Sequence, residues 1–138
     1  MQAPSPREIR LALERLLYDV LSPEGVRLSA KNKKFDHKKA TLWARATTRL
    51  GSPKTMEKGA GKALGTRPGV FIVQLFLLPE QDIGICEELC SKIETAFRLI
   101  SLGNVFCEEP ATVEVGLDKE DAWYQFNVII PFWTWVGE

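Results

Sequence analysis

The sequence predicts an α+β fold in which an antiparallel sheet of about four to five strands is packed by two amphipathic helices, in the order α-β-β-α-β-β. Three observations lead to this prediction. Two segments repeat apolar residues at helical spacing, several strand-like segments follow one another without an intervening helix, and 138 residues are enough for only one domain. We therefore expect a single domain over residues 1–138.

The two helices are predicted from their caps and their apolar stripes. Ser5 and Glu8 have the spacing of a capping box, and Pro6 suits the first turn. Asp82 can cap the second helix, and Gly103 can form its C-terminal cap. The first stripe consists of Ile9, Ala12, Leu13, Leu16, Leu17 and Val20, and the second of Cys86, Leu89, Cys90, Ile93, Phe97 and Ile100.

The strands are predicted from alternation and composition. Val70–Leu78 is apolar on both faces apart from Gln74, which favours a central strand covered on both sides. Thr41–Arg49 alternates, and so do Thr112–Leu117 and Trp123–Phe132. Short extra strands are considered at Val26–Leu28 and Val105–Cys107. The residues expected on one side of the first alternating segment are Trp43, Arg45, Thr47 and Arg49.

The segment from Leu50 to Arg67 contains four glycines and one proline but few large apolar residues. Loops longer than about 12–15 residues in a small domain are usually functional or disordered. We expect a long flexible loop at about residues 50–67, forming an elongated hairpin tip between two strands. Its lysines Lys54, Lys58 and Lys62 would reach a neighbouring subunit and become ordered on assembly.

No catalytic or cofactor-binding motif is found. The single histidine, His37, lies among lysines, without a carboxylate placed to orient it as a catalytic base. The segment Gly59–Gly65 lacks both the first glycine and the hydroxyl residue of a phosphate-binding loop. Carboxylates are numerous but are expected on solvated surfaces. We therefore predict a protein that is not an enzyme and uses no cofactor.

The three cysteines are predicted to be reduced and metal-free. Cys86 and Cys90 continue the apolar stripe of the second helix, and their spacing to Cys107 and His37 matches no usual zinc knuckle. An odd number of cysteines favours a reducing compartment. No run of about 18 apolar residues is present, so we expect a soluble protein without a membrane segment.

Charge is divided unevenly along the chain. Residues 1–67 contain 15 basic and 6 acidic side chains, whereas residues 68–138 contain 3 and 12. This division suits contact with a polyanion or with a complementary copy of the chain, and equally a fold in which the charges mix on one surface. The candidate basic patch, facing a subunit interface or a pore, consists of Arg27, Lys31, Lys33, Lys34, Lys38 and Lys39.

The layout resembles the tail-terminator family of long-tailed bacteriophages, of the lambda minor tail protein U type, together with related prophage proteins. The resemblance spans residues 7–133. It is carried, in order, by the helix Ile9–Leu16, the strand Thr41–Arg49, the segment Arg67–Phe76 that closes the glycine-rich loop, the break Leu78–Pro79, the helix Glu87–Phe97 and the closing strand Trp123–Phe132.

The resemblance implies a virion component that forms a hexameric ring, stops growth of the tail tube and presents a surface to the head. Its partners would be copies of itself, the tail-tube and head-connector proteins and, in a pore, DNA contacted without sequence specificity. The free chain could be monomeric. The protein would be found in the virion tail, and in the bacterial host cytoplasm during assembly.

Two alternatives and one local ambiguity remain. The chain could be a head–tail connector or completion protein of the neck, or a small nucleic-acid-binding domain that uses residues 27–39. Trp133 and Trp135 could be interface anchors, or could pack beneath the first helix.

Overall fold

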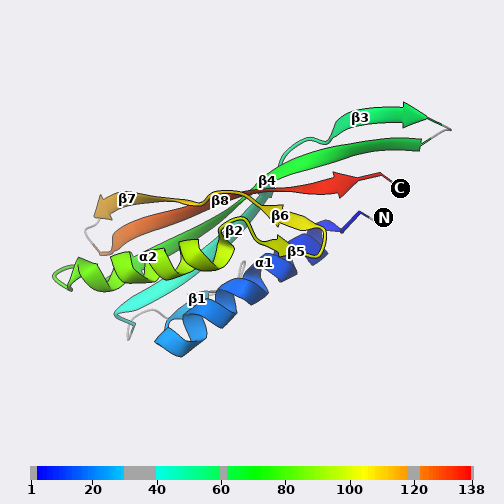
Figure 1. Cartoon of the computed structure of the whole chain (residues 1–138). Coiled ribbons are helices and arrows are strands. Elements are labelled where there is room, and N and C mark those ends of the chain that lie inside the picture. Colours follow the sequence, from blue (N-terminus) through cyan, green and yellow to red (C-terminus); the bar gives the residue numbers. More distant parts are fainter. Residues whose placement is uncertain (1–2, 30–39, 60–61, 118–121, 138) are drawn as a thin grey trace.

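The computed structural model describes residues 3–29, 40–59, 62–117 and 122–137. For residues 55–59 and 62–64 it describes the backbone without the side chains. These residues form one large twisted sheet with two helices against it (Figure 1). The elements are α1 (Pro6–Leu21), the 3-10 turn η1 (Ser22–Glu24), β1 (Arg27–Ser29), β2 (Leu42–Leu50), β3 (Lys54–Gly59), β4 (Lys62–Leu77), α2 (Ile83–Phe97), β5 (Ser101–Leu102), β6 (Val105–Cys107), β7 (Ala111–Leu117) and β8 (Tyr124–Val136).

The sheet corrects the predicted fold class. It has eight strands among the described residues, in the order β1-β2-β4-β8-β6-β5, with β3 paired to β4 and β7 paired to β8. It is mixed, because β1 runs parallel to β2 while the other pairs are antiparallel. The expected antiparallel sheet of four to five strands, in the order α-β-β-α-β-β, is therefore wrong. Of the short extra strands considered from the sequence, Val105–Cys107 is confirmed as β6 and Val26–Leu28 overlaps β1, whereas β5, with two residues, is too short to show alternation.

The helix starts follow the capping residues. Ser5 Oγ accepts a hydrogen bond from the Glu8 backbone N–H at 3.1 Å, and the Ser5 N–H donates to Glu8 Oε1 at 3.2 Å, which completes the capping box. Asp82 Oδ1 accepts from the Gly84 N–H at 2.9 Å at the start of α2. The expected end of α2 at Gly103 is wrong. The helix stops at Phe97, and Gly103 lies in the turn between β5 and β6.

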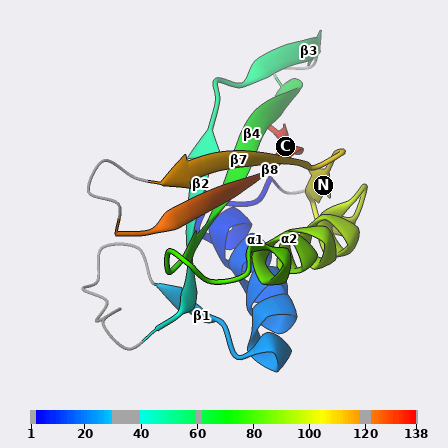
Figure 2. The same ribbon diagram turned by 90° about the vertical axis from the view of Figure 1, so that its left-hand side faces the viewer.

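Both helices pack on one face of the sheet, as the rotated view shows (Figure 2). We call this the inner face and the opposite one the outer face. The largest fully buried side chains of the core include Phe71, Phe97, Ile9, Leu13, Leu17, Leu75 and Ile130. The alternation expected for β2 is confirmed, because Ala44 and Ala46 belong to this core while Arg45 and Arg49 are exposed.

The prediction that the apolar central strand is covered on both sides is wrong. β4 does lie between β2 and β8, and its inner residues Phe71, Val73 and Leu75 are fully buried. On the outer face Val70 and Ile72 are only half-buried, because both helices lie on the inner side. Apolar side chains on both faces of a strand therefore do not reflect a second covering layer within this chain.

The expected loop over residues 50–67 is replaced by strands. Lys54 of β3 pairs with Thr66 of β4, and the ladder continues to Gly59 and Lys62, so the two strands form a hairpin. Figure 1 shows this hairpin extending beyond the body formed by the helices. Glycine weakens a strand, but each paired residue gains backbone hydrogen bonds on the ladder. The flexibility of this segment stays a prediction.

None of the helices in the described ranges is long and apolar enough to cross a membrane.

Close packing of β4 on β8 yields a test of the core. Gly69 pairs with Phe132, and a Cβ atom at this glycine would lie 2.7 and 2.9 Å from Cε2 and Cε1 of that ring, closer than real contacts allow. Phe132 is 2% exposed, so its ring cannot swing into solvent. Gly69→Ala should therefore lower the free energy of unfolding by about 1–3 kcal/mol, measured by urea denaturation.

The matched control for this substitution is the double variant Gly69→Ala with Phe132→Leu. Leucine removes the ring atoms that the new methyl group meets, so the second change should make Gly69→Ala less costly than it is in the wild-type background. Equal costs in both backgrounds would contradict the close-packing explanation.

Candidate assembly surface

An aromatic cluster occupies the outer face near the start of β2. The rings of Trp43 and Phe76 stack with centroids 4.3 Å apart, and Trp123 meets Trp43 edge-on at 5.8 Å. The Arg45 guanidinium lies 5.2 Å from the Trp43 ring and 5.6 Å from the Phe76 ring, within cation–π range. The Arg45 guanidinium thus lies over rings from two strands, β2 and β4, and Trp123 before β8 completes the cluster.

Trp133 and Trp135 form a second aromatic group on the same face. Trp133 stacks on Phe106 of β6 at 4.4 Å and meets Trp135 edge-on at 5.3 Å. Thr134 between them is 1% exposed and points inward, so the two tryptophans point away from the helices. The interpretation that they pack beneath the first helix is wrong. Both are half-buried, and their role as interface anchors stays a prediction.

Four exposed basic side chains lie on the outer face, on strands β1, β2 and β3. Strand register places them on this side, because their partners are outer-face residues of β2 and β4. Among the strand residues whose side chains the structure describes, none that points to this face is acidic. We call this set the basic row, and it consists of Arg27, Arg45, Arg49 and Lys54.

The basic row includes only part of the set predicted from the sequence. Arg27 and Lys54 were predicted, whereas Arg45 and Arg49 were missed as binding residues although their shared side of the strand was recognised. The signal in the sequence that could have found them is the alternation along this strand, where large and basic residues alternate with Ala44 and Ala46. Lys31, Lys33, Lys34, Lys38 and Lys39 lie outside the described residues, and for Lys58 and Lys62 only the backbone, in β3 and β4, is described.

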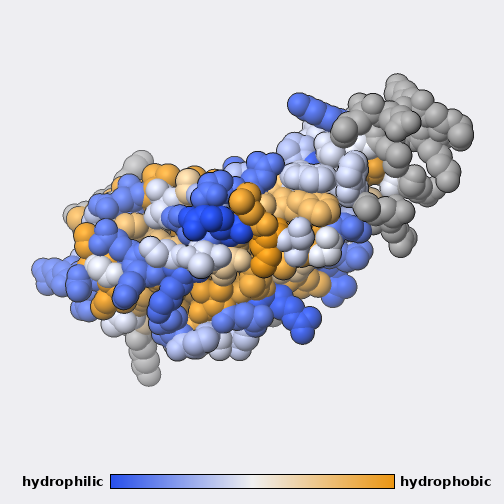
Figure 3. Space-filling model, viewed as in Figure 1, coloured by the Kyte–Doolittle hydropathy of each residue, from blue (hydrophilic) through white to orange (hydrophobic). Residues whose placement is uncertain are grey.

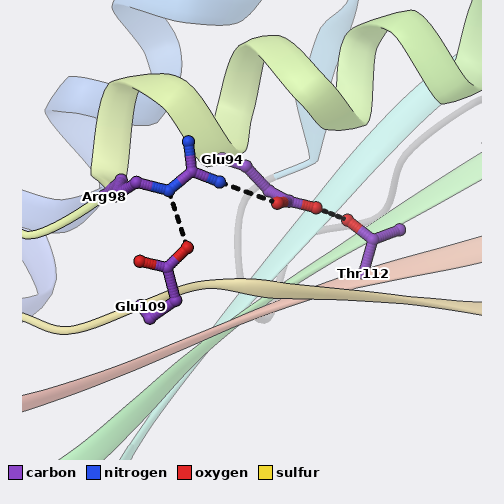
Figure 4. Close-up of polar contacts among 4 residues, drawn as sticks. All are labelled: Glu94, Arg98, Glu109 and Thr112. Atoms are coloured by element: carbon purple, nitrogen blue, oxygen red, sulfur yellow. Dashed lines mark hydrogen bonds and ion pairs between the residues drawn. The ribbon is translucent and has the colours of Figure 1, made fainter.

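A groove of opposite charge lies between α2 and β7 on the other side of the molecule. It has a volume of about 280 Å³, and its lining includes Glu87, Glu94 and Glu114 together with Cys90 and Thr112. Glu94 accepts hydrogen bonds from Thr112 and Arg98, the latter at 3.3 Å (Figure 4). The hydrogen bond from Thr112 joins β7 to α2, and both contacts hold the Glu94 carboxylate. We call this the acidic groove.

Neighbouring groups partly balance the groove's charge. The Arg98 Nε donates to Glu109 Oε1 at 2.7 Å, and this hydrogen bond raises the pKa of Arg98. The Tyr124 hydroxyl donates to Glu114, which raises the pKa of the tyrosine because its ionised form would face a carboxylate. The arrangement can bind cationic side chains through ion pairs and hydrogen bonds.

No group of three or more His, Cys, Asp or Glu side chains within the described ranges could hold a metal ion. Cys86, Cys90 and Cys107 are free and buried, and the placement of Cys86 and Cys90 on the core stripe of α2 is confirmed. Donation of a hydrogen bond from the Cys86 thiol to Cys90, together with burial, raises the pKa of Cys86. Their metal-free state stays a prediction.

Burial raises the pKa of the Cys107 thiol from 9.0 to about 11, which gives a pH test. Folding favours the neutral thiol, so its stabilising contribution is complete below pH 9 and is lost as the pH rises towards 11. Raising the pH from about 8 to about 11 should lower the free energy of unfolding, measured with urea. This decrease should be about 2 kcal/mol smaller in Cys107→Ala than in the wild type. Identical pH dependence in the two proteins would contradict this assignment.

Comparison with known proteins bears on the fold alone. No family model matches this sequence, and no curated protein is similar to it. A solved structure, of a protein whose own name describes no function, has a similar fold, with a TM-score of 0.63 over 94% of this chain and 95% of the other at 17% identity.

Proposed function

We propose that this chain is a structural protein of a phage or prophage tail, which assembles into a ring, caps the tail tube and contributes to joining the head to the tail. It acts in the virion tail, after assembly in the host cytoplasm, and carries out no catalysis. The observation that carries the proposal is the outer face, where apolar and aromatic side chains lie half-buried without a covering layer from this chain. The family resemblance gives the ring six subunits.

The outer face supports binding to protein. Val70, Ile72 and Ile129 lie at its centre, between the two aromatic groups. Contiguous apolar surface on a soluble protein usually marks an interaction site, and tryptophan and arginine are enriched where such sites bind most strongly. Hydrophobic residues also reach the surface elsewhere between polar ones (Figure 3). Among the described residues, the exposed large hydrophobic side chains are Leu11, Tyr18, Ile83, Ile85, Leu99, Val113, Val115 and Leu117.

The distribution of charge supports head-to-tail assembly. The basic row lies on the outer face, and the acidic groove lies on the inner side between α2 and β7. A subunit with two complementary surfaces can bind one neighbour with each of them, and such contacts form a ring when the rotation closes. Complementary charge also speeds encounter and selects the partner.

A small nucleic-acid-binding domain is the second candidate, and the basic row is the observation that favours it. Nucleic acid binding without sequence specificity combines cations with aromatic rings on which bases stack. Trp43 is only 3% exposed and its face is occupied by Phe76, so it offers no free ring for stacking. The aliphatic centre of the face also suits protein better than phosphate.

Binding to isolated tail tubes tests the proposed function. The purified chain should bind one end of tubes prepared without their terminator and stop their further growth, as seen by negative-stain electron microscopy. DNA-filled heads without tails are the matched alternative target. Binding to heads alone would make the chain a connector protein instead. Binding to neither, with salt-sensitive binding to DNA, would favour the nucleic-acid-binding alternative.

The contribution of the basic row is tested by reversing two of its charges. Arg45→Glu with Arg49→Glu should weaken subunit association about tenfold or more, because the contact loses attraction and gains repulsion. Both side chains are exposed, so folding should be little affected. The control is Arg7→Glu with Arg15→Glu, two exposed positions on α1. Sedimentation velocity that finds equal association in both variants would exclude a role for the row.

A further inference from the structure

Four strands of the described sheet, β1, β3, β5 and β7, pair on one side only, and β3 and β7 are the two that are longer than three residues. β7 pairs with β8 and with no other strand in the part of the chain that the structure describes, and the same holds for β3 on β4. The backbone N–H and C=O groups on the far side of each strand are therefore available to a further strand. Such edges readily pair with another chain.

The two open edges lie on opposite sides and at opposite ends of the molecule. β3 pairs with the beginning of β4, whereas β7 pairs with the beginning of β8. β4 and β8 are antiparallel, so their beginnings are far apart, and Leu77 at the end of β4 meets Tyr124 at the start of β8. Figure 1 shows β3 and β7 at the two extremes of the sheet.

β7 lacks two of the usual protections of an edge strand, because its sequence from Ala111 to Leu117 contains neither lysine nor proline. It does carry one acidic residue, Glu114, and one bulge. Its bulge lies between Glu114 and Gly116, so residues 111–114 stay in regular register. Val113 is 46% exposed and Val115 is 49% exposed. With Leu117, they are three of the eight exposed large apolar side chains among the described residues, gathered on a seven-residue strand.

We propose that β7 of one subunit pairs with β3 of a second copy of this chain, so that neighbouring sheets are joined edge to edge. This inference rests on the proposed ring and names the contact that forms it. The charges select β7 as the partner of β3, because Lys54 and Lys58 of β3 oppose pairing with a second β3 edge, whereas β7 carries Glu114 and no lysine. Antiparallel or parallel pairing would both satisfy the backbone groups.

The position of the edges makes a second copy the fitting occupant. A β7–β3 contact uses different surfaces on its two sides, so each subunit keeps one open edge for the next neighbour until the ring closes. A β7–β7 contact would stop at a dimer and leave β3 unpaired. The wide separation of β3 and β7 within one subunit also prevents them from pairing with each other.

The β7 edge is blocked by Val113→Lys with Val115→Lys. Both side chains are about half exposed, so the fold should persist, while two lysines oppose strand addition. The matched control is Leu11→Lys with Tyr18→Lys, which introduces the same charges at exposed apolar positions of α1. The control should assemble like the wild type and the edge variant should be monomeric, by sedimentation equilibrium with circular dichroism as the check on folding.

The β3 edge is removed by replacing residues 56–64 with Asn-Gly, which closes a two-residue hairpin after the Thr55–Gly65 pair. This shortened variant should also be monomeric alone. Mixed in equal amounts with the β7-blocked variant, it should form dimers containing one copy of each and nothing larger, because only one complementary pair of edges remains. Failure of the mixture to form dimers would overturn the inference.

The outcomes separate this inference from the proposed function. If the β7-blocked variant still forms rings, or if the α1 control loses them as well, edge pairing is wrong. Neither result contradicts ring assembly by the wild-type chain. A wild-type chain that stays monomeric at about 1 mM also contradicts edge pairing. The proposed function is judged independently by binding to tail tubes, and edge pairing could hold in a protein that binds no tube.

Discussion

The antiparallel pairing of β4 with β8 is the constraint on which the rest of the structure depends. It runs without interruption from the Gly65–Val136 pair to the Leu77–Tyr124 pair. Every other strand attaches to this ribbon directly or through one neighbour, and both helices pack on its inner side. Gly69 allows the aromatic ring of Phe132 to pack directly over the β4 backbone. The ribbon is therefore both the core of the fold and the support for its surfaces.

The ribbon is longer than the helices that cover it, and this difference explains the exposed features of the molecule. The inner face is closed by α1 and α2, whereas the outer face keeps half-buried aliphatic and aromatic residues. At the two extremes of the ribbon, β3 and β7 extend the sheet and leave their own edges open. Open strand edges and apolar faces of this kind suit the assembly with copies of the chain that we propose.

Local signals in the sequence were sufficient for the helix starts, for β2, for the second half of β4 and for most of β8. The capping box at Ser5 and the cap at Asp82 are local hydrogen-bonding patterns, and β2 and β8 alternate over many residues. The number of strands was not predictable in this way. β1 forms by parallel pairing with β2, and β3, from a segment expected to be a loop, forms by pairing with β4. Both pairings are tertiary effects.

The candidate surface was predicted only in part for a related reason. Arg27 and Lys54 lie in segments expected to be exposed connections, and they were predicted as binding residues. Arg45 and Arg49 lie within an expected strand, and they were not. Their alignment depends on register between strands, which brings residues from three segments onto one face. Trp133 and Trp135 were predicted either as interface anchors or as residues packed beneath the first helix. The burial of Thr134 between them shows that they lie on the outer face.

Native mass spectrometry of the unmodified chain across a range of concentrations tests the central claim, closed ring assembly, most directly. Head-to-tail contacts that close predict a single oligomer of fixed subunit number, with no larger species as concentration rises. Six copies would agree with the family resemblance. A chain that stays monomeric throughout, or a ladder of masses that lengthens with concentration, would contradict the account.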